Sequence, residues 1–260
     1  MSISSTKLMG GLGNYLFQIA AAFNIALRDN KRLVIDISDI DIVHEPIESY
    51  TKNIFRRINF QKGVGPAQPI SQQGFHYVEI PKYETPTKLY GYFQSEKYFE
   101  QFSEQLRSLY GIDPETKNYI LEKYGDSLNR KTCSLHVRRG NYLKFPENHP
   151  VLTTDYYKEA ISHFDDDTLF LIFSDDIKWC EDNLTFIKNK VFITGNKDYQ
   201  DLYLMSLCND NIIANSSFSW WGAWLNENKN KKVISPSKWF GNAYSHWDLN
   251  DLYCNKWIKI

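Results

Sequence analysis

The sequence predicts an α/β fold built on mainly parallel sheets and divided into two halves. Short runs of β-branched residues alternate along the chain with amphipathic helical stretches, which is the pattern of βαβ units. A chain of 260 residues is long enough for one large domain or two small ones that share a cleft. The polar segment Gly125–Arg130 separates an irregular first half from a regular second half. We therefore expect one domain over residues 1–125 and another over residues 131–260.

The first half begins with a glycine-rich turn, Gly10–Gly13, which is expected to open a helix from about Asn14 to Arg28. Residues 32–36 have the composition of a strand. The prolines between residues 38 and 86 predict loops and short elements rather than a regular βα unit. The remaining elements expected in this half are a strand at 89–93 and helices near 96–109 and 114–124.

The second half has a regular alternation of strands and helices. We expect strands at 132–137, 168–173, 190–193, 211–214 and 232–234, with helices at 155–164, 177–184, 198–208 and 219–226 between them. In the last of these helices, Phe218, Trp221 and Leu225 have the spacing of a buried stripe. This order predicts a doubly wound half-domain, in which ligands bind beyond the carboxyl ends of the strands.

Composition excludes several classes of function. Lys and Arg number 30 against 31 Asp and Glu, so the chain lacks the basic bias that nucleic acids and anionic membranes attract. The four cysteines form no C-x-x-C pair, and neither a zinc cage nor a disulfide framework is expected. The amino terminus lacks the apolar core of a signal peptide, and the longest mainly apolar stretch, 16–27, is shorter than the ~20 residues that span a bilayer. We expect a cytoplasmic protein without a transmembrane segment.

Three polar clusters follow three of the expected strands. They are Arg138–Tyr142, Ser174–Asp176 and Asn215–Ser219. If the strands are parallel, their carboxyl ends lie at one edge of the sheet and bring the clusters together. His136 lies two residues before Arg138, so on a strand both side chains point to the same face, where His136 can bond a base or phosphates.

The contents of these clusters suit a nucleoside diphosphate. Arg138 and Arg139 can neutralise a pyrophosphate, because a guanidinium matches phosphate oxygens with two parallel bonds. Adjacent arginines are also typical of a solvated surface pair. Asp175 or Asp176 can accept bonds from a guanine edge or a ribose hydroxyl. Paired aspartates also bind Mg²⁺, but the arginines already supply the charge that a metal would bring, so we expect neither a metal nor a resident cofactor.

The segment Asn215-Ser216-Ser217, with Ser219, opens the expected last helix. Its free backbone N–H groups and hydroxyls would form a second phosphate cradle. The same residue types are typical of a simple helix cap. Because the other two polar clusters are expected to lie nearby, we favour the phosphate-binding interpretation over a simple helix cap.

The turn Gly11-Leu12-Gly13 is superficially similar to a dinucleotide-binding turn, with Asp36 where a ribose-binding acid would stand. Leu16, however, replaces the third glycine of that motif. A helix amino terminus that faces a ligand, with Asn14 in its first turn, is the preferred interpretation. A nicotinamide oxidoreductase is the most distant alternative.

Five segments together resemble the α-1,2-fucosyltransferases of glycosyltransferase family eleven. They are Gly10–Gln18, Gly91–Ser95, His136–Tyr142, Phe173–Asp176 and Ile212–Leu225, in the family's order along nearly the whole chain. The resemblance implies two Rossmann-like halves facing a cleft, as in GT-B enzymes. It also implies a metal-independent, inverting transfer of L-fucose from GDP-fucose to the 2-hydroxyl of a galactoside, with a nucleotide sugar and a glycan acceptor as partners.

On the matched positions the resemblance also implies roles. His136 with Asp175 or Asp176 would bind the guanosine. Asn14 would face the fucose or the acceptor from the opposite domain. The pyrophosphate would be held by Arg138 together with Ser216, Ser217 and Ser219. Glu147, His149 and Asp155 follow the arginine motif and are candidates for a general base, although Glu147 and His149 are equally consistent with exposed loop residues.

Two positions depart from the family pattern. Tyr15 stands where the family usually has Gln, and Asn141 where it has Asp. Asparagine keeps the hydrogen bonds of aspartate but cannot take a proton. Either that acid is structural in the family, or another group acts as base, or the activity differs. The alternatives are a transferase with another GDP-sugar or acceptor, and a nucleotide-sugar-binding protein with impaired catalysis.

Overall fold

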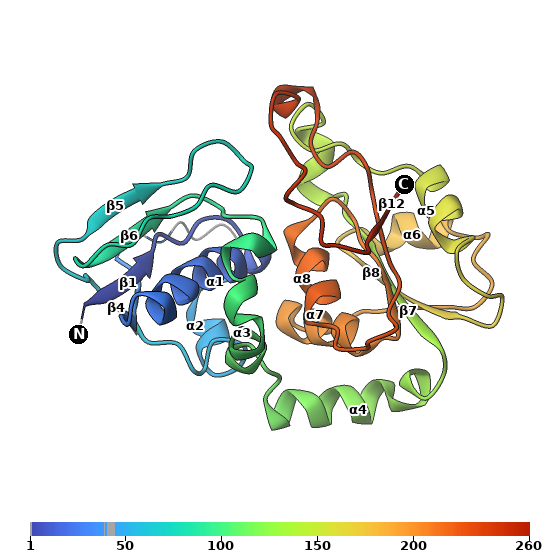
Figure 1. The fold of residues 1–260 in the computed structure, drawn as a ribbon. Helices are drawn as coiled ribbons and strands as arrows, with labels where there is room; N and C mark the ends of the chain where they lie inside the picture. Colours follow the sequence, from blue (N-terminus) through green and yellow to red (C-terminus); the bar gives the residue numbers. More distant parts are fainter. Residues whose placement is uncertain (1, 39, 41–44) are drawn as a thin grey trace. The chain divides into compact units, whose positions relative to one another are not determined.

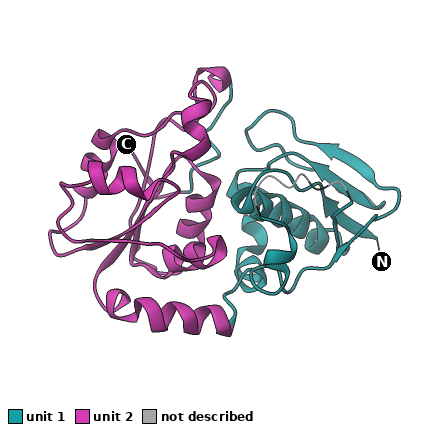
Figure 2. Cartoon of the chain, turned by 180° about the vertical axis from the view of Figure 1, so that it is seen from behind, with its two compact units in different colours: residues 1–113, 247–254 teal, residues 114–246, 255–260 magenta. Residues whose placement is uncertain are grey.

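The computed structural model describes residues 2–38, 40 and 45–260. The chain forms two compact units, drawn in two colours in Figure 2. Unit 1 comprises residues 1–113 and 247–254, and unit 2 comprises residues 114–246 and 255–260. Helix α4 (Pro114–Leu128) therefore belongs with the second unit, whereas the expected division at 125–131 assigned it to the first. The roles given to the two halves, acceptor side and GDP-sugar side, stay predictions.

Unit 1 is built on a parallel sheet with strand order β2-β1-β6-β5 (Figure 1). The strands are β1 (Ile3–Thr6), β2 (Arg32–Leu33), β5 (Gln68–Ser71) and β6 (Thr87–Tyr90). Helix α1 (Leu12–Arg28) packs on this sheet, where Ser4 Oγ donates to Ala22 O at 2.8 Å. The expected helix at 14–28 is thus confirmed and begins two residues earlier.

The strand expected at 32–36 is divided between two sheets. Val34 N donates to Ser4 O in the main sheet, but Ile35 N donates to Asn59 O on the other side. Successive N–H groups of an extended chain point in opposite directions. As a result, β3 (Ile35–Asp36) pairs with β4 (Phe60–Gln61) in a separate two-stranded sheet.

The region from 87 to 109 also differs from expectation. Strand β6 ends at Tyr90 instead of extending to Phe93, because Gly91 (φ +153°) and Phe93 (φ +52°) leave the extended conformation. The helix expected at 96–109 is replaced by three short elements. They are the 3₁₀ turns η1 (Glu96–Tyr98) and η2 (Glu100–Phe102) and helix α3 (Ser103–Leu109). Helix α2 (Glu48–Thr51) of unit 1 lies earlier in the chain.

Unit 2 contains a six-stranded parallel sheet with strand order β12-β11-β10-β7-β8-β9. The strands are β7 (Thr132–Val137), β8 (Leu169–Ser174), β9 (Lys190–Phe192), β10 (Asp210–Ile212), β11 (Val233–Ser235) and β12 (Ile258–Lys259). The helices are α5 (Thr154–Ile161), α6 (Ile177–Asn183), α7 (Asp198–Leu207) and α8 (Ser217–Leu225), with turns η3 (Gly140–Lys144) and η4 (Asn242–Tyr244). The predicted α/β class with parallel sheets is confirmed.

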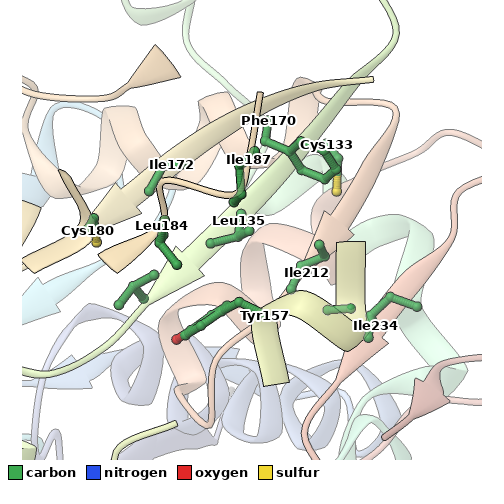
Figure 3. Close-up of a cluster of buried hydrophobic side chains, with 12 residues drawn as sticks. Cys133, Leu135, Tyr157, Phe170, Ile172, Cys180, Leu184, Ile187, Ile212 and Ile234 are labelled. Carbon is green, nitrogen blue, oxygen red and sulfur yellow. The ribbon is translucent and has the colours of Figure 1, made fainter. Parts of the chain in front are cut away.

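The two faces of β7 contact different helices. Cys133, Leu135 and Val137 point into a buried apolar cluster with Tyr157 of α5 and Cys180 of α6 (Figure 3). The alternate residues face the other side of the sheet, since side chains alternate along a strand. Figure 1 shows α7 and α8 on that side, and there the His136 ring lies 5.7 Å from that of Phe218.

Helix α8 is buried on all sides, which differs from the single stripe expected for it. Residues 219–224 are all buried, whereas Phe218 and Leu225 are only partly buried. The rings of Trp220, Trp221 and Trp224 pack on one another. Among the described residues, no helix is long and apolar enough to cross a membrane.

Candidate functional site

The three strands that precede the polar clusters are neighbours in the unit 2 sheet. Strand β7 lies between β8 and β10 and is parallel to both, with Val137 opposite Ser174 and Leu135 opposite Ile212. The chain adds β8 and β9 on one side of β7, then crosses to add β10 and β11 on the other. The carboxyl edge at such a reversal is where open α/β sheets bind ligands. The predicted convergence of the three clusters is therefore present.

Arg138 is held by two side chains. Its Nη1 lies 2.9 Å from Asp175 Oδ2, and its Nη2 donates to Asn141 Oδ1 at 2.7 Å. The Arg138 side chain nevertheless remains 24% exposed. These bonds use two of the five N–H donors of a guanidinium, so donors remain for ligand oxygens. Arg138 is a fixed cation that solvent, and hence a solute, can reach.

Arg139 has a different environment. Its Nε donates to Asp176 Oδ2 at 3.0 Å, and its guanidinium carbon lies 4.2 Å from the ring centre of Trp179. The hydrogen bond from Arg139 lowers the pKa of Asp176. Asp176 also accepts from Trp179 N through Oδ1, which caps α6. Arg139 therefore ties the loop after β7 to the start of α6.

Asp175 contacts both motif arginines. Its Oδ2 pairs with the Arg138 guanidinium, and its Oδ1 accepts the backbone N–H of Arg139 at 2.9 Å. A Cβ on Gly140 would stand 2.3 Å from the same Oδ2, a distance no side chain tolerates. Any larger residue at position 140 would force the Asp175 carboxylate to move. In the part of the chain that the structure describes, no three His, Cys, Asp or Glu side chains are placed to hold a metal ion.

His136 is buried at the end of β7, with only 6% of its surface exposed. Its Nδ1 has no hydrogen-bond partner within the described protein. Burial, and secondly the charge of Arg138, lower the pKa of His136 to about 3. The imidazole is therefore neutral at physiological pH, and a ligand with a matching polar group would satisfy the unpaired nitrogen.

The segment from Asn215 to Ser219 connects β10 to α8. Ser216 Oγ accepts from Phe218 N and caps the helix, while Ser219 Oγ accepts from Ala214 N. Ser217 is the first residue of α8 and is half-buried. Asn215 donates from Nδ2 to Pro150 O at 2.9 Å and to Trp239 O at 3.0 Å. The amide of Asn215 thus holds two neighbouring loops in place.

The loop that follows η3 carries the candidate general bases. The His149 imidazole stacks on the Tyr142 ring at 4.6 Å, and burial, then Arg138, lower the pKa of His149. Glu147 is exposed, and its backbone O accepts from Ala243 N. Asp155 lies in the first turn of α5, where its exposed carboxylate pairs with Lys158. Of these three, only His149 packs on Tyr142, whose ring also lies 5.4 Å from the guanidinium carbon of Arg138.

Asn14 belongs to unit 1, in the first turn of α1. Its Oδ1 accepts from Gln94 Nε2 at 2.8 Å, and its Nδ2 occupies the space where a Cβ on Gly10 would lie. Asp36, the alternative ribose-binding acid, instead pairs with Lys88 at 2.9 Å and accepts from Ser38. These bonds give Asp36 a structural role in unit 1.

Comparison with known proteins places the chain among glycosyltransferases. The model of glycosyl transferase family 11 matches residues 68–260. The chain is 31% identical to the O-antigen biosynthesis glycosyltransferase WbnK of Escherichia coli, over 97% of this chain and 99% of that protein. It is 30% identical to an α-1,2-colitosyltransferase of Escherichia coli, over 100% of this chain and 99% of that protein. The fold is similar to that of the fucosyltransferase NodZ from Bradyrhizobium, with a TM-score of 0.56 and 15% identity over 85% of this chain and 91% of that chain.

Proposed function

This chain belongs to glycosyltransferase family 11, and on that premise we propose that it transfers L-fucose from GDP-fucose to the 2-hydroxyl of a galactoside, with inversion at the anomeric carbon. The observation that carries the proposal is the fixed, reachable cation of Arg138 between Asp175 and Asn141. It lies where a doubly wound sheet binds nucleotides. NodZ, which shares the fold, is described as an α-1,6-fucosyltransferase whose crystals were soaked with GDP-fucose.

In this proposal the pyrophosphate binds between Arg138 and the first turn of α8. Arg138 offers a positive charge, and the amino end of α8 at Ser217 adds backbone N–H groups and the positive end of the helix dipole. Negative charge grows on the GDP leaving group as the glycosidic bond breaks. A cation already fixed by Asp175 stabilises that charge without reorganising, and such preorganised charge often contributes most to catalysis. Arg139 supports the loop, because Asp176 and Trp179 already occupy its side chain.

The guanosine is assigned to the neighbourhood of His136. The neutral imidazole has a buried nitrogen that needs a partner, and a purine edge provides one. Asp175 and Asp176, expected from the family resemblance to bind the guanosine, are engaged with the arginines. Their contribution is therefore assigned to the position of Arg138 and of the loop after β7.

His149 is the proposed general base. It is neutral because its pKa lies below the usual value, and it stacks on Tyr142, which also contacts Arg138. Glu147 projects into solvent, and the amide of Asn14 cannot take a proton. Asn14, held by Gln94, is assigned to the positioning of fucose or acceptor.

A product assay tests the proposal. The purified chain is incubated with GDP-fucose and lactose, with and without EDTA, and the product is analysed by mass spectrometry and by NMR of the anomeric proton. Fucosyl-α-1,2-lactose in both samples is the expected result. Binding of GDP-fucose without any product would instead favour the nucleotide-sugar-binding alternative, and loss of product in EDTA would contradict metal independence.

A second donor is favoured by one specific observation. The α-1,2-colitosyltransferase is similar to this chain over its whole length, and colitose is fucose without its 3-hydroxyl. The second candidate function is therefore transfer of colitose from GDP-colitose. Measuring kcat/KM for both donors at one acceptor concentration decides between them, since the natural donor should be preferred by about 10-fold or more if a polar group pairs with the 3-hydroxyl.

A further inference from the structure

Tyr142 connects the loop after β7, the loop that carries His149 and the chain just after β10. It lies in η3, four residues after Arg138, and its side chain is buried. Its hydroxyl donates to the backbone O of Asn215 at 3.0 Å, just after β10. Because burial raises the pKa of Tyr142 to about 12, the hydroxyl keeps its proton and remains a donor at physiological pH.

The ring of Tyr142 makes two further contacts. The His149 imidazole stacks on it with centroids 4.6 Å apart and planes inclined by 17°. The guanidinium carbon of Arg138 lies 5.4 Å from the same ring centre, within the range of a cation–π contact. One side chain thus contacts the proposed pyrophosphate cation and the proposed base, and is fixed to the end of β10.

We propose that Tyr142 is a positioning residue that holds Arg138 and His149 in place relative to the segment Asn215–Ser217, with the hydroxyl fixing the ring and the ring fixing the two side chains. The inference rests on the function proposed above. The bonds that hold Arg138 come from Asp175 and Asn141, on the β8 side and in its own loop, whereas the bond of Tyr142 reaches the β10 side. A small shift of the Tyr142 ring would therefore displace the cation from the start of α8, and displacements near 1 Å are costly in catalysis.

Tyr156 provides a matched control. Its hydroxyl donates to the backbone O of Ile213 at 2.6 Å, two residues before Asn215 and outside the segment Asn215–Ser217. Its ring, however, packs against the apolar cluster and Tyr157, whereas the ring of Tyr142 packs against Arg138 and His149. Replacing either tyrosine with phenylalanine removes a hydrogen bond to a backbone carbonyl, and Tyr142→Phe also removes the contact of its hydroxyl with Ser216. Only Tyr142→Phe is expected to loosen the two site residues.

The test compares Tyr142→Phe and Tyr156→Phe with the wild type in three measurements: thermal unfolding, kcat and KM for GDP-fucose transfer to lactose, and the Kd for GDP by calorimetry. We expect both variants to lose a similar amount of Tm, about 2–4 °C. Tyr142→Phe should lower kcat/KM by about 10-fold or more, mainly through kcat, while Tyr156→Phe stays within about 2-fold. Equal kinetic effects of the two variants would overturn the inference.

Failure of the proposed function is distinguishable in the same experiment. If the wild type makes no product, the proposed function is wrong. The measurement of GDP affinity then tests the positioning role of Tyr142 independently of catalysis. In that measurement Tyr142→Phe should weaken GDP binding by about 3-fold or more, since it loosens Arg138, and Tyr156→Phe should not. Unchanged GDP affinity in Tyr142→Phe would overturn the positioning role without reference to catalysis.

Discussion

Arg138 Nη2 donates a 2.7 Å hydrogen bond to Asn141 Oδ1. This contact explains how asparagine can serve at a position where the family resemblance leads us to expect aspartate. Asn141 Oδ1 accepts one bond from the guanidinium, a role that an amide oxygen can fill in place of a carboxylate oxygen. The carboxylate of Asp175 already holds Arg138 from its other side, through Nη1. An acid at position 141 is therefore not needed to hold the arginine.

The first prediction concerns position 141. Asn141→Asp should keep kcat/KM within about 3-fold of wild type, whereas Asn141→Ala should lower it by about 10-fold or more, because a hydrogen bond to a charged group is lost. Steady-state kinetics with GDP-fucose check both variants. A gain of about 100-fold in Asn141→Asp would show instead that the site lacks a proton acceptor.

The second prediction concerns Gly140. In Gly140→Ala the new Cβ meets Asp175 Oδ2 at 2.3 Å, so the carboxylate that holds Arg138 must move. We expect kcat/KM to decrease by about 10-fold or more. Gly125→Ala is the control, since nothing lies within 4 Å of that position in α4. It should stabilise the protein by about 0.5–1 kcal/mol and leave activity unchanged; equal activity in both variants would contradict the proposed role of Gly140.

The third prediction concerns stability and pH. The pKa of His136 is about 3 in the folded protein against 6.5 in the unfolded chain, so below pH 6.5 only the unfolded chain takes up this proton. Stability from this group is fully present above pH 6.5 and is lost towards pH 3, by about 1.4 kcal/mol per pH unit. Burial raises the pKa of Asp201 to about 6. The contribution of Asp201 to stability therefore increases as the pH decreases, opposite to that of His136.

Urea unfolding of the wild type and His136→Leu between about pH 7.5 and 4.5 separates the two effects. The Asp201 contribution is common to both proteins and cancels in the difference. The stability of His136→Leu relative to wild type should rise as the pH decreases. Parallel stability curves would show that His136 is not buried as the neutral form.

The fourth prediction concerns the general base. His149→Gln should lower kcat by about 100-fold or more, and Glu147→Gln, its control, should stay within about 2-fold because Glu147 is exposed. The pKa of His149 lies below 6.5, so the acidic limb of the wild-type kcat/KM profile should lie below pH 6.5 and disappear in His149→Gln. An unchanged profile in that variant would exclude His149.

The sequence predicted unit 2 better than unit 1 for a physical reason. Strand β7 was predicted at its observed bounds, 132–137, because a run of strand-forming residues is flanked by polar ones. Unit 1 depends more on contacts distant in sequence. Trp247 stacks on Phe75 at 5.0 Å, and Asp251 accepts from Tyr77 N, so residues 247–254 join unit 1 from the far end of the chain. Local sequence patterns do not predict contacts between residues this far apart in the chain.

At the candidate site, too, the sequence predicted the local clusters but not the contacts between them. The clusters after β7, β8 and β10 were predictable, since parallel strands bring their carboxyl ends together. The pairing of Arg138 with Asp175, and of Arg139 with Asp176, depends on the register that sets Val137 opposite Ser174. The sequence pattern alone favoured both arginines for the pyrophosphate and did not indicate the contacts of Trp179 and Gln94 or the space required at Gly140. In the sequence, the glycine between the arginines and Asn141 is the feature that could have indicated this close approach.

Steady-state transfer of fucose from GDP-fucose to lactose by Arg138→Ala tests the central claim most directly. Arg130→Ala is the matched control, since Arg130 is an exposed arginine before β7. If Arg138 is the preorganised cation for the leaving GDP, its removal lowers kcat/KM at least about 100-fold while Arg130→Ala retains wild-type activity. Near-normal turnover by a folded Arg138→Ala variant would contradict the assignment of the donor site.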